Sequence, residues 1–307
     1  MTKEGTAAKF CEVASPMASF SVPHVSQAPE LNTDPHSPTW AHASATWIAR
    51  DCTRQIDYPK IKTEVRGFWT DSDLYLLFIS PYTELNLWLP ADNTKDRLKL
   101  WDRDVVEFFL GDDWTDIKHY REFEIAPTGD WVDLAIDLNK ESYSADWSSG
   151  WERMGRIDEK NHIWYAAARV PLRSVGEKQV VAGTRWRANL YRIDGLGEDP
   201  QRHFMCWQPT CVVNRDPNHV PEHFGTSKQQ SNRRGFMKML AASPLLAQIA
   251  AQGLYEKSAV AMGLDPRGNV YRRLGVKTVI NCRGTWTYLS GSLQFPEVQN
   301  AQAEAGR

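Results

Sequence analysis

The sequence predicts an all-β fold, an antiparallel β-sandwich of the immunoglobulin-like or jelly-roll-like kind. Between residues 38 and 226, short segments of β-branched and aromatic residues alternate with polar residues, and turn sequences separate them. Helical periodicity is almost absent from the same region. Because a parallel sheet would need helical crossovers between its strands, we expect the strands to pair antiparallel in two packed sheets.

The clearest strands are residues 105–110, 120–126 and 131–136, and the P-T-G-D sequence at 127–130 predicts a tight turn between the last two. Period-two alternation places Glu122 and Glu124 on one face of the second strand, opposite to its apolar side chains. This face is polar enough to meet water or a polar ligand.

Further strands are expected on both sides of this central set. Residues 63–69 and 74–80 read as a hairpin around the turn sequence T-D-S-D. Residues 162–170 and 185–193 read as strands, 203–207 as a short strand, and 20–25 as another short one. Long loops are expected at 84–99 and 139–155.

The composition divides the chain into four parts. Residues 1–37 are rich in Ala, Ser and Pro and predict a loosely ordered leader, and residues 38–226 carry the sandwich. Residues 227–262 combine a basic linker with an apolar, signal-like helix, and residues 263–307 begin a different kind of sequence. We therefore expect a poorly ordered, partly helical C-terminal tail after the sandwich.

Charge and cysteine content exclude several classes of protein. The formal net charge of −2 over 307 residues gives no support to binding of nucleic acid or of an anionic membrane. No apolar run is long enough for a membrane span, and the N-terminus as written carries no secretory signal. Five cysteines at irregular spacing define no disulfide framework, although Cys206 and Cys211 are close enough to bridge across a loop.

Six segments in order resemble carbohydrate-binding module family 9. These segments are T-E-V-R-G-F-W-T-D-S-D-L-Y-L-L-F, W-D-R-D-V-V-E-F-F-L, E-F-E-I-A-P-T-G-D-W-V-D, A-A-R-V-P-L, W-R-A-N-L-Y-R and H-F-G, and they lie in this order within the region of residues 38 to 226 that bears the resemblance. The resemblance implies a bacterial β-sandwich that binds poly- or oligosaccharides without catalysing a reaction, commonly beside enzymes of polysaccharide breakdown. An extracytoplasmic role is consistent with that family.

Proteins bind sugars by stacking them on aromatic rings and by hydrogen bonds from Arg, Asn and carboxylate groups. The candidate ligand residues are Trp101, Arg103, Glu107, Asn189, Arg192 and Trp207, with Trp88 and Trp147 as loop platforms. Asn189 is equally well explained by a structural hydrogen bond inside the sandwich, because a buried amide needs partners. Most of the tryptophans are expected to serve as core.

Other functions stay open at this point. A glycan hydrolase would use a pair of carboxylates, one of them with a raised pKa in a cleft, and a haem or redox sandwich is a further alternative. The resemblance also allows a bound calcium ion, although the sequence has no EF-hand-like loop. His219 and His223 have the spacing of a helical zinc pair, but Pro221 between them disfavours a helix, so they are expected to pack in a loop.

The C-terminal part carries a second, local resemblance. Residues 231–238, S-N-R-R-G-F-M-K, resemble a twin-arginine export signal, and a short apolar run follows them. The later sequence Y-R-R-L-G-V-K-T-V-I-N-C-R-G-T-W-T-Y-L-S-G-S is similar to the start of selenocysteine-synthase-like, pyridoxal-phosphate-dependent enzymes. The segment ends before any Schiff-base lysine region, so we expect it to be catalytically empty.

Overall fold

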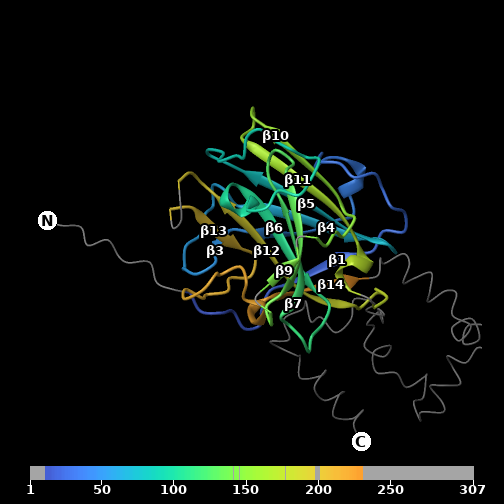
Figure 1. Ribbon diagram of the computed structural model, residues 1–307. Helices are drawn as coiled ribbons and strands as arrows, with labels where there is room; N and C mark the ends of the chain where they lie inside the picture. Colours follow the sequence, from blue (N-terminus) through green and yellow to red (C-terminus); the bar gives the residue numbers. More distant parts are fainter. Residues whose placement is uncertain (1–10, 141, 145, 177, 198–200, 231–307) are drawn as a thin grey trace, which may run out of the picture. The chain divides into compact units, whose positions relative to one another are not determined.

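The computed structural model describes residues 11–140, 142–144, 146–176, 178–197 and 201–230 (Figure 1). These residues all belong to the first of the two units into which the chain divides, Met1–Arg233. The signal-like segment and the pyridoxal-phosphate-enzyme-like segment lie outside the described residues, as does the predicted C-terminal tail. None of the described helices is long and apolar enough to cross a membrane.

The described residues form a sandwich of two sheets, as the sequence predicts (Figure 1). The larger sheet has nine strands, and seven of them follow the order β1-β14-β12-β6-β7-β8-β9, while β13 pairs with β12 and β3 with β13. Its strands are β1 (Ser19–Pro23), β3 (Arg50–Asp51), β6 (Val105–Gly111), β7 (His119–Ile125), β8 (Trp131–Asp137), β9 (Ser142–Ser144), β12 (Arg185–Asp194), β13 (His203–Cys206) and β14 (Gly225–Gln230). Only the β1–β14 pair among these is parallel.

The smaller sheet has five antiparallel strands in the order β10-β11-β5-β4-β2. They are β2 (Ser44–Ile48), β4 (Thr63–Trp69), β5 (Asp73–Pro81), β10 (Glu152–Asp158) and β11 (Ile163–Pro171). The described helical segments are short: α1 (Leu172–Val175) and the 3-10 turns η1 (Pro38–Trp40), η2 (Leu100–Asp102) and η3 (Pro221–His223).

The predicted central set is confirmed as β6, β7 and β8, which pair in sequence order. The turn between β7 and β8 closes through a hydrogen bond from Ala126 N to Asp130 O at 2.8 Å. Gly129 in this turn has a φ of 87°, a left-handed conformation that a residue without Cβ adopts at no steric cost. The tight turn therefore fixes the register of the two strands.

Alternation along the strands separates two apolar layers. Phe108 and Phe123 face the space between the sheets, where Phe108 stacks on Phe123 at 4.8 Å and on Phe78 of the other sheet at 6.0 Å. Phe109 and Tyr120 point from the same strands to the outer face of the large sheet and join a second buried cluster. Loops cover this outer face, so it is an interior surface as well.

The N-terminal segment corrects one prediction. The expected loose leader at 1–37 is wrong for the part that includes β1, because β1 pairs along β14 and buries Phe20 and Val22 in the core between the sheets. The short strand that the sequence predicts at 20–25 lies in this part of the chain and is confirmed as β1. At the other end, β14 continues to Gln230, past the predicted end of the sandwich at residue 226.

Two disulfides join parts of the chain for which the sequence defines no disulfide framework. Cys206 and Cys211 are close enough in sequence to bridge but do not pair with each other: Cys52 pairs with Cys206, and Cys11 pairs with Cys211. The pairing of β13 with β3 brings Cys206 to the segment that contains Cys52. The bridges span 154 and 200 residues, so local spacing contains no trace of them.

Candidate functional site

A cavity of about 460 Å³ lies on the outer face of the large sheet. Its floor consists of side chains from β6, β7, β8 and β12, namely Glu107, Glu122, Glu124, Leu134, Ile136 and Ile193. Its walls come from η2, from the start of β13 and from the loop before η3, namely Trp101, Asp102, Arg202, Phe204, Asp216, Pro217, Asn218 and His219. Apolar and aromatic side chains that line a cavity together with a few polar groups are typical of a small-ligand site.

Three glutamates on the floor are almost completely buried. Glu107 on β6 and Glu124 on β7 are direct partners across the two strands, and Glu122 lies two residues before Glu124 on the same face. Direct cross-strand partners have Cβ atoms about 4.5–5.5 Å apart, and like charges at that position destabilise a sheet. The strand alternation that buries Phe108 and Phe123 on the opposite face forces the glutamates to share this one.

The hydrogen bonds of the glutamates are unequal. Glu107 Oε2 accepts a bond of 2.9 Å from Asn218 Nδ2. Neither carboxyl oxygen of Glu124 receives a hydrogen bond from the described residues. The Glu122 carboxyl lies within reach of Glu124, but two carboxylates cannot donate to each other, so this contact forms only when one of them is protonated.

Burial is the main cause of the shifted pKa values of the three glutamates. It raises the pKa of Glu107, Glu122 and Glu124 above the ordinary glutamate value. Repulsion from Glu122 raises the pKa of Glu107 further, and repulsion from Glu107 and Glu122 does the same for Glu124. The floor of the cavity therefore holds protons at pH values where exposed glutamates are ionised.

Trp101 is the largest aromatic side chain of the wall. It lies in η2, and Arg202 holds this turn by donating from Nη1 and Nη2 to Trp101 O, both at 3.0 Å. The loop before η3 is held on the opposite side by Tyr191 OH, which donates to Asn218 O at 2.8 Å. Tyr120 OH and His219 Nδ1 are 2.6 Å apart and add a second link. Both walls are thus anchored to the sheet.

Four of the eight residues expected from the sequence lie at this end of the large sheet. Trp101 and Glu107 line the cavity. Trp88 packs against the outer cluster, and the Arg103 guanidinium lies 4.6 Å from the centre of its ring. Because Arg103 occupies a face of Trp88, that ring is not an open platform, and neither residue lines the cavity.

Asn189 and Arg192 have structural surroundings. Asn189 Nδ2 donates to Tyr191 OH and to Gln208 O, and its Oδ1 accepts from Leu190 N and Gln208 N, so its bonding capacity is used. Arg192 is buried between the sheets, where it donates to Ile61 O, Thr63 Oγ1 and Pro81 O and pairs with Asp194. Neither side chain lines the cavity.

Trp147 and Trp207 pack on the other side of the large sheet. Trp207 makes an edge contact with Phe20 at 6.4 Å, and Trp147 makes one with Phe123 at 6.2 Å. Both pack against the core between the sheets. The structure therefore does not bring them together with Trp101 and Glu107.

Sequence reasoning missed most of the wall. Strand alternation predicts that Glu122 and Glu124 share a carboxylate face but does not place them among the ligand residues, and no motif marks Arg202, Phe204 or Asn218. His219 was expected to pack in a loop, and it does so while lining the cavity; His223 Nδ1 lies 2.6 Å from Thr210 O. Within the described part of the chain, no group of three or more His, Cys, Asp or Glu could hold a metal ion.

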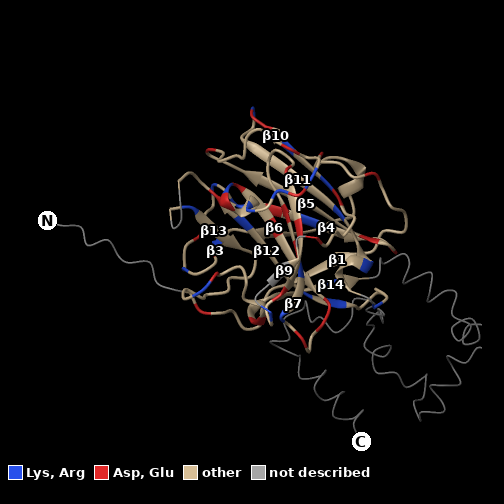
Figure 2. Ribbon diagram, in the orientation of Figure 1, with Lys and Arg blue, Asp and Glu red and all other residues tan. Residues whose placement is uncertain are grey.

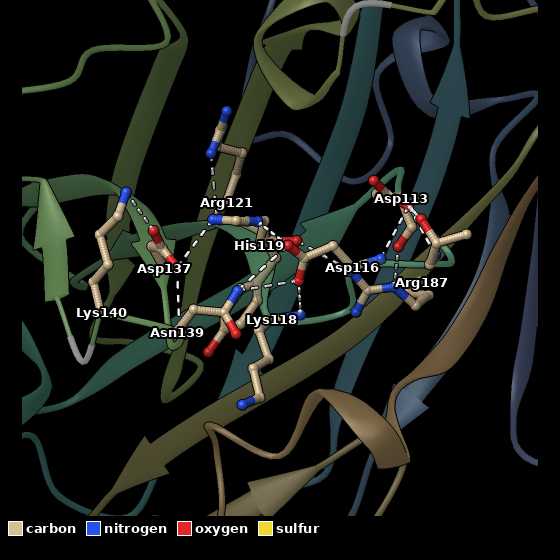
Figure 3. Close-up of polar contacts among 11 residues, drawn as sticks. Asp113, Asp116, Lys118, His119, Arg121, Asp137, Asn139, Lys140 and Arg187 are labelled. Carbon is tan, nitrogen blue, oxygen red and sulfur yellow. Dashed lines mark hydrogen bonds and ion pairs between the residues drawn. The ribbon is translucent and has the colours of Figure 1, made fainter.

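Two other polar features of the described residues differ from this cavity. A hollow of about 480 Å³ contains Arg169, but its guanidinium is already paired with Asp73 and Glu152, both at 3.0 Å. Figure 3 shows His119 between the carboxylates of Asp116 and Asp137, at 2.7 and 2.9 Å. These groups satisfy one another, and charges of both signs are spread over the described residues (Figure 2). The buried glutamates differ because they face a cavity with acceptor atoms unused.

Comparisons with known proteins support the fold. No protein-family model matches the chain, and no curated protein matches it significantly. A solved structure of a candidate carbohydrate-binding protein from Bacteroides uniformis is 21% identical, covers 70% of this chain and 100% of its own, and has a TM-score of 0.55. A family 9 carbohydrate-binding module from Caldicellulosiruptor kristjanssonii with cellotriose is 13% identical over 70% of this chain and 95% of its own, with a TM-score of 0.49. The module from the same organism with glucose is 14% identical over 70% of this chain and 97% of its own, with a TM-score of 0.48. The described residues thus share their sandwich fold with the Bacteroides protein.

Proposed function

We propose that the sandwich is a non-catalytic carbohydrate-binding module that holds its ligand in the cavity over β6, β7 and β8. The observation that carries the proposal is the meeting of the Trp101 wall with three buried glutamates whose acceptor atoms are largely unused. A sugar ring offers an apolar face for an aromatic side chain and a rim of hydroxyl donors for carboxyl oxygens. The family 9 resemblance of the sequence and the description of the Bacteroides protein point to the same function.

The site in this proposal comprises Trp101, Glu107, Glu122, Glu124 and Asn218. Trp88 and Arg103 lie at the same end of the large sheet but do not line the cavity. Buried polar groups that lack protein partners carry a free-energy penalty, and a ligand that supplies hydrogen bonds removes it. Local features that cost stability concentrate at functional sites, and the Glu107–Glu124 pair is such a feature.

The arrangement of the carboxyl groups favours binding over hydrolysis. A glycosidase places its two carboxyl groups on opposite sides of the bond that breaks. Glu107, Glu122 and Glu124 instead extend from neighbouring positions of one sheet face. Hydrolysis stays the second candidate because the raised pKa values in a cavity are what a general acid requires.

Calorimetric titration with gluco-configured disaccharides tests the proposal. We use cellobiose, its N-acetylated 2-amino analogue and the corresponding free-amine disaccharide as probes, and we assay each mixture for released reducing sugar. The expected result is saturable binding of at least one disaccharide without hydrolysis. Release of reducing ends would support the hydrolase, and an absence of binding for all three probes would remove the carbohydrate proposal.

A further inference from the structure

The cavity has an excess of acidic side chains. Asp102, Glu107, Glu122, Glu124 and Asp216 face it from η2, β6, β7 and the loop before η3. The basic or titratable groups that face it are Arg202 and His219. The Arg202 guanidinium is directed to backbone oxygens of Trp101 and Arg103, and His219 Nε2 lies 3.7 Å from Glu122 Oε2. The acidic groups therefore outnumber the cations that face them.

Glu124 identifies the position where this imbalance is greatest. Its side chain is completely buried beneath the cavity that it lines, and both of its oxygens lack a hydrogen-bond donor among the described residues. A buried carboxylate without a donor or a counter-charge is costly, and burial removes that charge by raising its pKa. Glu107 lies directly across from it and Glu122 beside it, so one positive group at this point would contact all three.

A sugar hydroxyl supplies one donor and no charge, whereas a primary ammonium supplies three donors and a positive charge. We propose that the cavity selects a carbohydrate that bears a free primary ammonium group, as a 2-amino-2-deoxy sugar without its acetyl group does. The sugar ring then lies against Trp101, and the ammonium group lies among Glu107, Glu122 and Glu124. This inference rests on the proposed carbohydrate-binding function and adds the class of sugar.

The test compares three disaccharides that share ring configuration and linkage, using the full chain in calorimetric titrations near neutral pH. They are cellobiose with a hydroxyl, its N-acetylated analogue with a neutral amide, and the free-amine disaccharide. A hydrogen bond to a charged group contributes more free energy than one between neutral groups. This difference predicts about 10- to 100-fold tighter binding of the free amine. Glu124→Gln removes the charge with little change of shape and is expected to abolish most of this preference.

Glu152→Gln is the matched control, because Glu152 is an exposed carboxylate on β10 that pairs with Arg169 and does not line this cavity. It should leave the preference unchanged. Titrations in two buffers of different ionisation enthalpy add an independent readout. The amine should release protons from the glutamates on binding, so its affinity should fall as the pH is lowered, while that of cellobiose should not.

Each other outcome overturns the inference in a recognisable way. Equal affinity for the three disaccharides, or a free-amine preference that survives Glu124→Gln, would remove the ammonium proposal but leave carbohydrate binding intact. Binding of a simple alkyl diamine with no binding of any disaccharide would remove the carbohydrate function itself. Saturable binding of Ca²⁺ that displaces the amine would identify the cavity as a metal site and contradict the inference.

Discussion

Glu107 on β6 and Glu124 on β7 are direct cross-strand partners on the outer face of the large sheet, and both are buried. Alternation along the two strands leaves them no other face, because Phe108 and Phe123 beside them fill the core between the sheets. Two carboxyl groups at this spacing repel each other when ionised. This pair therefore makes the sheet less stable, and its carboxyl oxygens are the acceptor atoms of the proposed site.

Glu124→Gln is expected to stabilise the folded protein at neutral pH by about 1–3 kcal/mol, because it removes a buried carboxyl group without a partner. The pKa of Glu124 is higher in the folded than in the unfolded chain. The folded state then binds more protons, so stability falls as the pH rises above the unfolded value of about 4.3. Urea unfolding at several pH values checks this: the gain of the variant should grow from acid to neutral pH. A loss of stability at neutral pH would show that the carboxylate is paired.

Reduction of the disulfides should loosen the wall of the cavity. Cys206 ends β13, and Cys211 precedes the loop that carries Asn218 and His219. Loss of such a bridge typically costs about 2–5 kcal/mol. Unfolding and disaccharide titration with and without dithiothreitol measure both effects, and removal of each pair by Ala substitution separates them. Unchanged affinity after full reduction would show that the wall does not depend on the bridges.

Asn189 and Arg192 should act on stability and not on ligand affinity. Arg192→Ala leaves Asp194 buried without its partner and removes the bonds to Ile61 O and Pro81 O, so about 3–5 kcal/mol should be lost. Asn189→Ala leaves Gln208 N without its acceptor and should cost about 1–3 kcal/mol. Chemical unfolding measures these losses, and titration of the folded fraction measures affinity. A selective loss of sugar binding in a stable variant would show that these residues belong to the ligand-binding site.

The pH dependence at His119 has the same sign as that at Glu124, but it falls in a higher pH range. Hydrogen bonds to Asp137, and the charges of Asp116 and Asp137, raise the pKa of His119, whereas the pKa of Asp137 is lowered to about 2 (Figure 3). The His119 contribution is present below its unfolded pKa, near 6.5, and is lost as the pH rises through the higher folded value. The group is partly exposed, so less than about 1 kcal/mol is expected. An NMR titration of His119, with unfolding of His119→Gln at acid and alkaline pH, measures it. A pKa at or below the ordinary value would contradict this account.

The sequence was sufficient for the central strands β6, β7 and β8 and for the faces of their side chains. The alternation at 120–126 predicted that Glu122 and Glu124 share a face, and the structure confirms it on the cavity floor. The same rule puts Asn189 and Arg192 on opposite faces of β12, so they could not both line one cavity. That consequence follows from residue parity alone.

The wall could not be predicted in this way. Asn218 and His219 reach Glu107 and Glu122 through a loop held by Tyr191, by Tyr120 and by bridges to Cys11 and Cys52. These contacts join parts of the chain far apart in sequence, and local pattern contains no information about them. β10 escaped prediction for another reason: it is an edge strand with mostly polar, partly exposed side chains, so it shows no apolar alternation.

The most direct test of the account is the affinity of Trp101→Ala for the tightest-binding disaccharide, measured beside Trp147→Ala. Trp101 lines the cavity, whereas Trp147 packs against the core between the sheets. The account predicts that Trp101→Ala weakens binding by about 1–3 kcal/mol, the contribution of one aromatic face, and that folded Trp147→Ala binds as the wild type does. Unchanged affinity in Trp101→Ala together with a loss in Trp147→Ala would contradict it and place the sugar elsewhere on the sandwich.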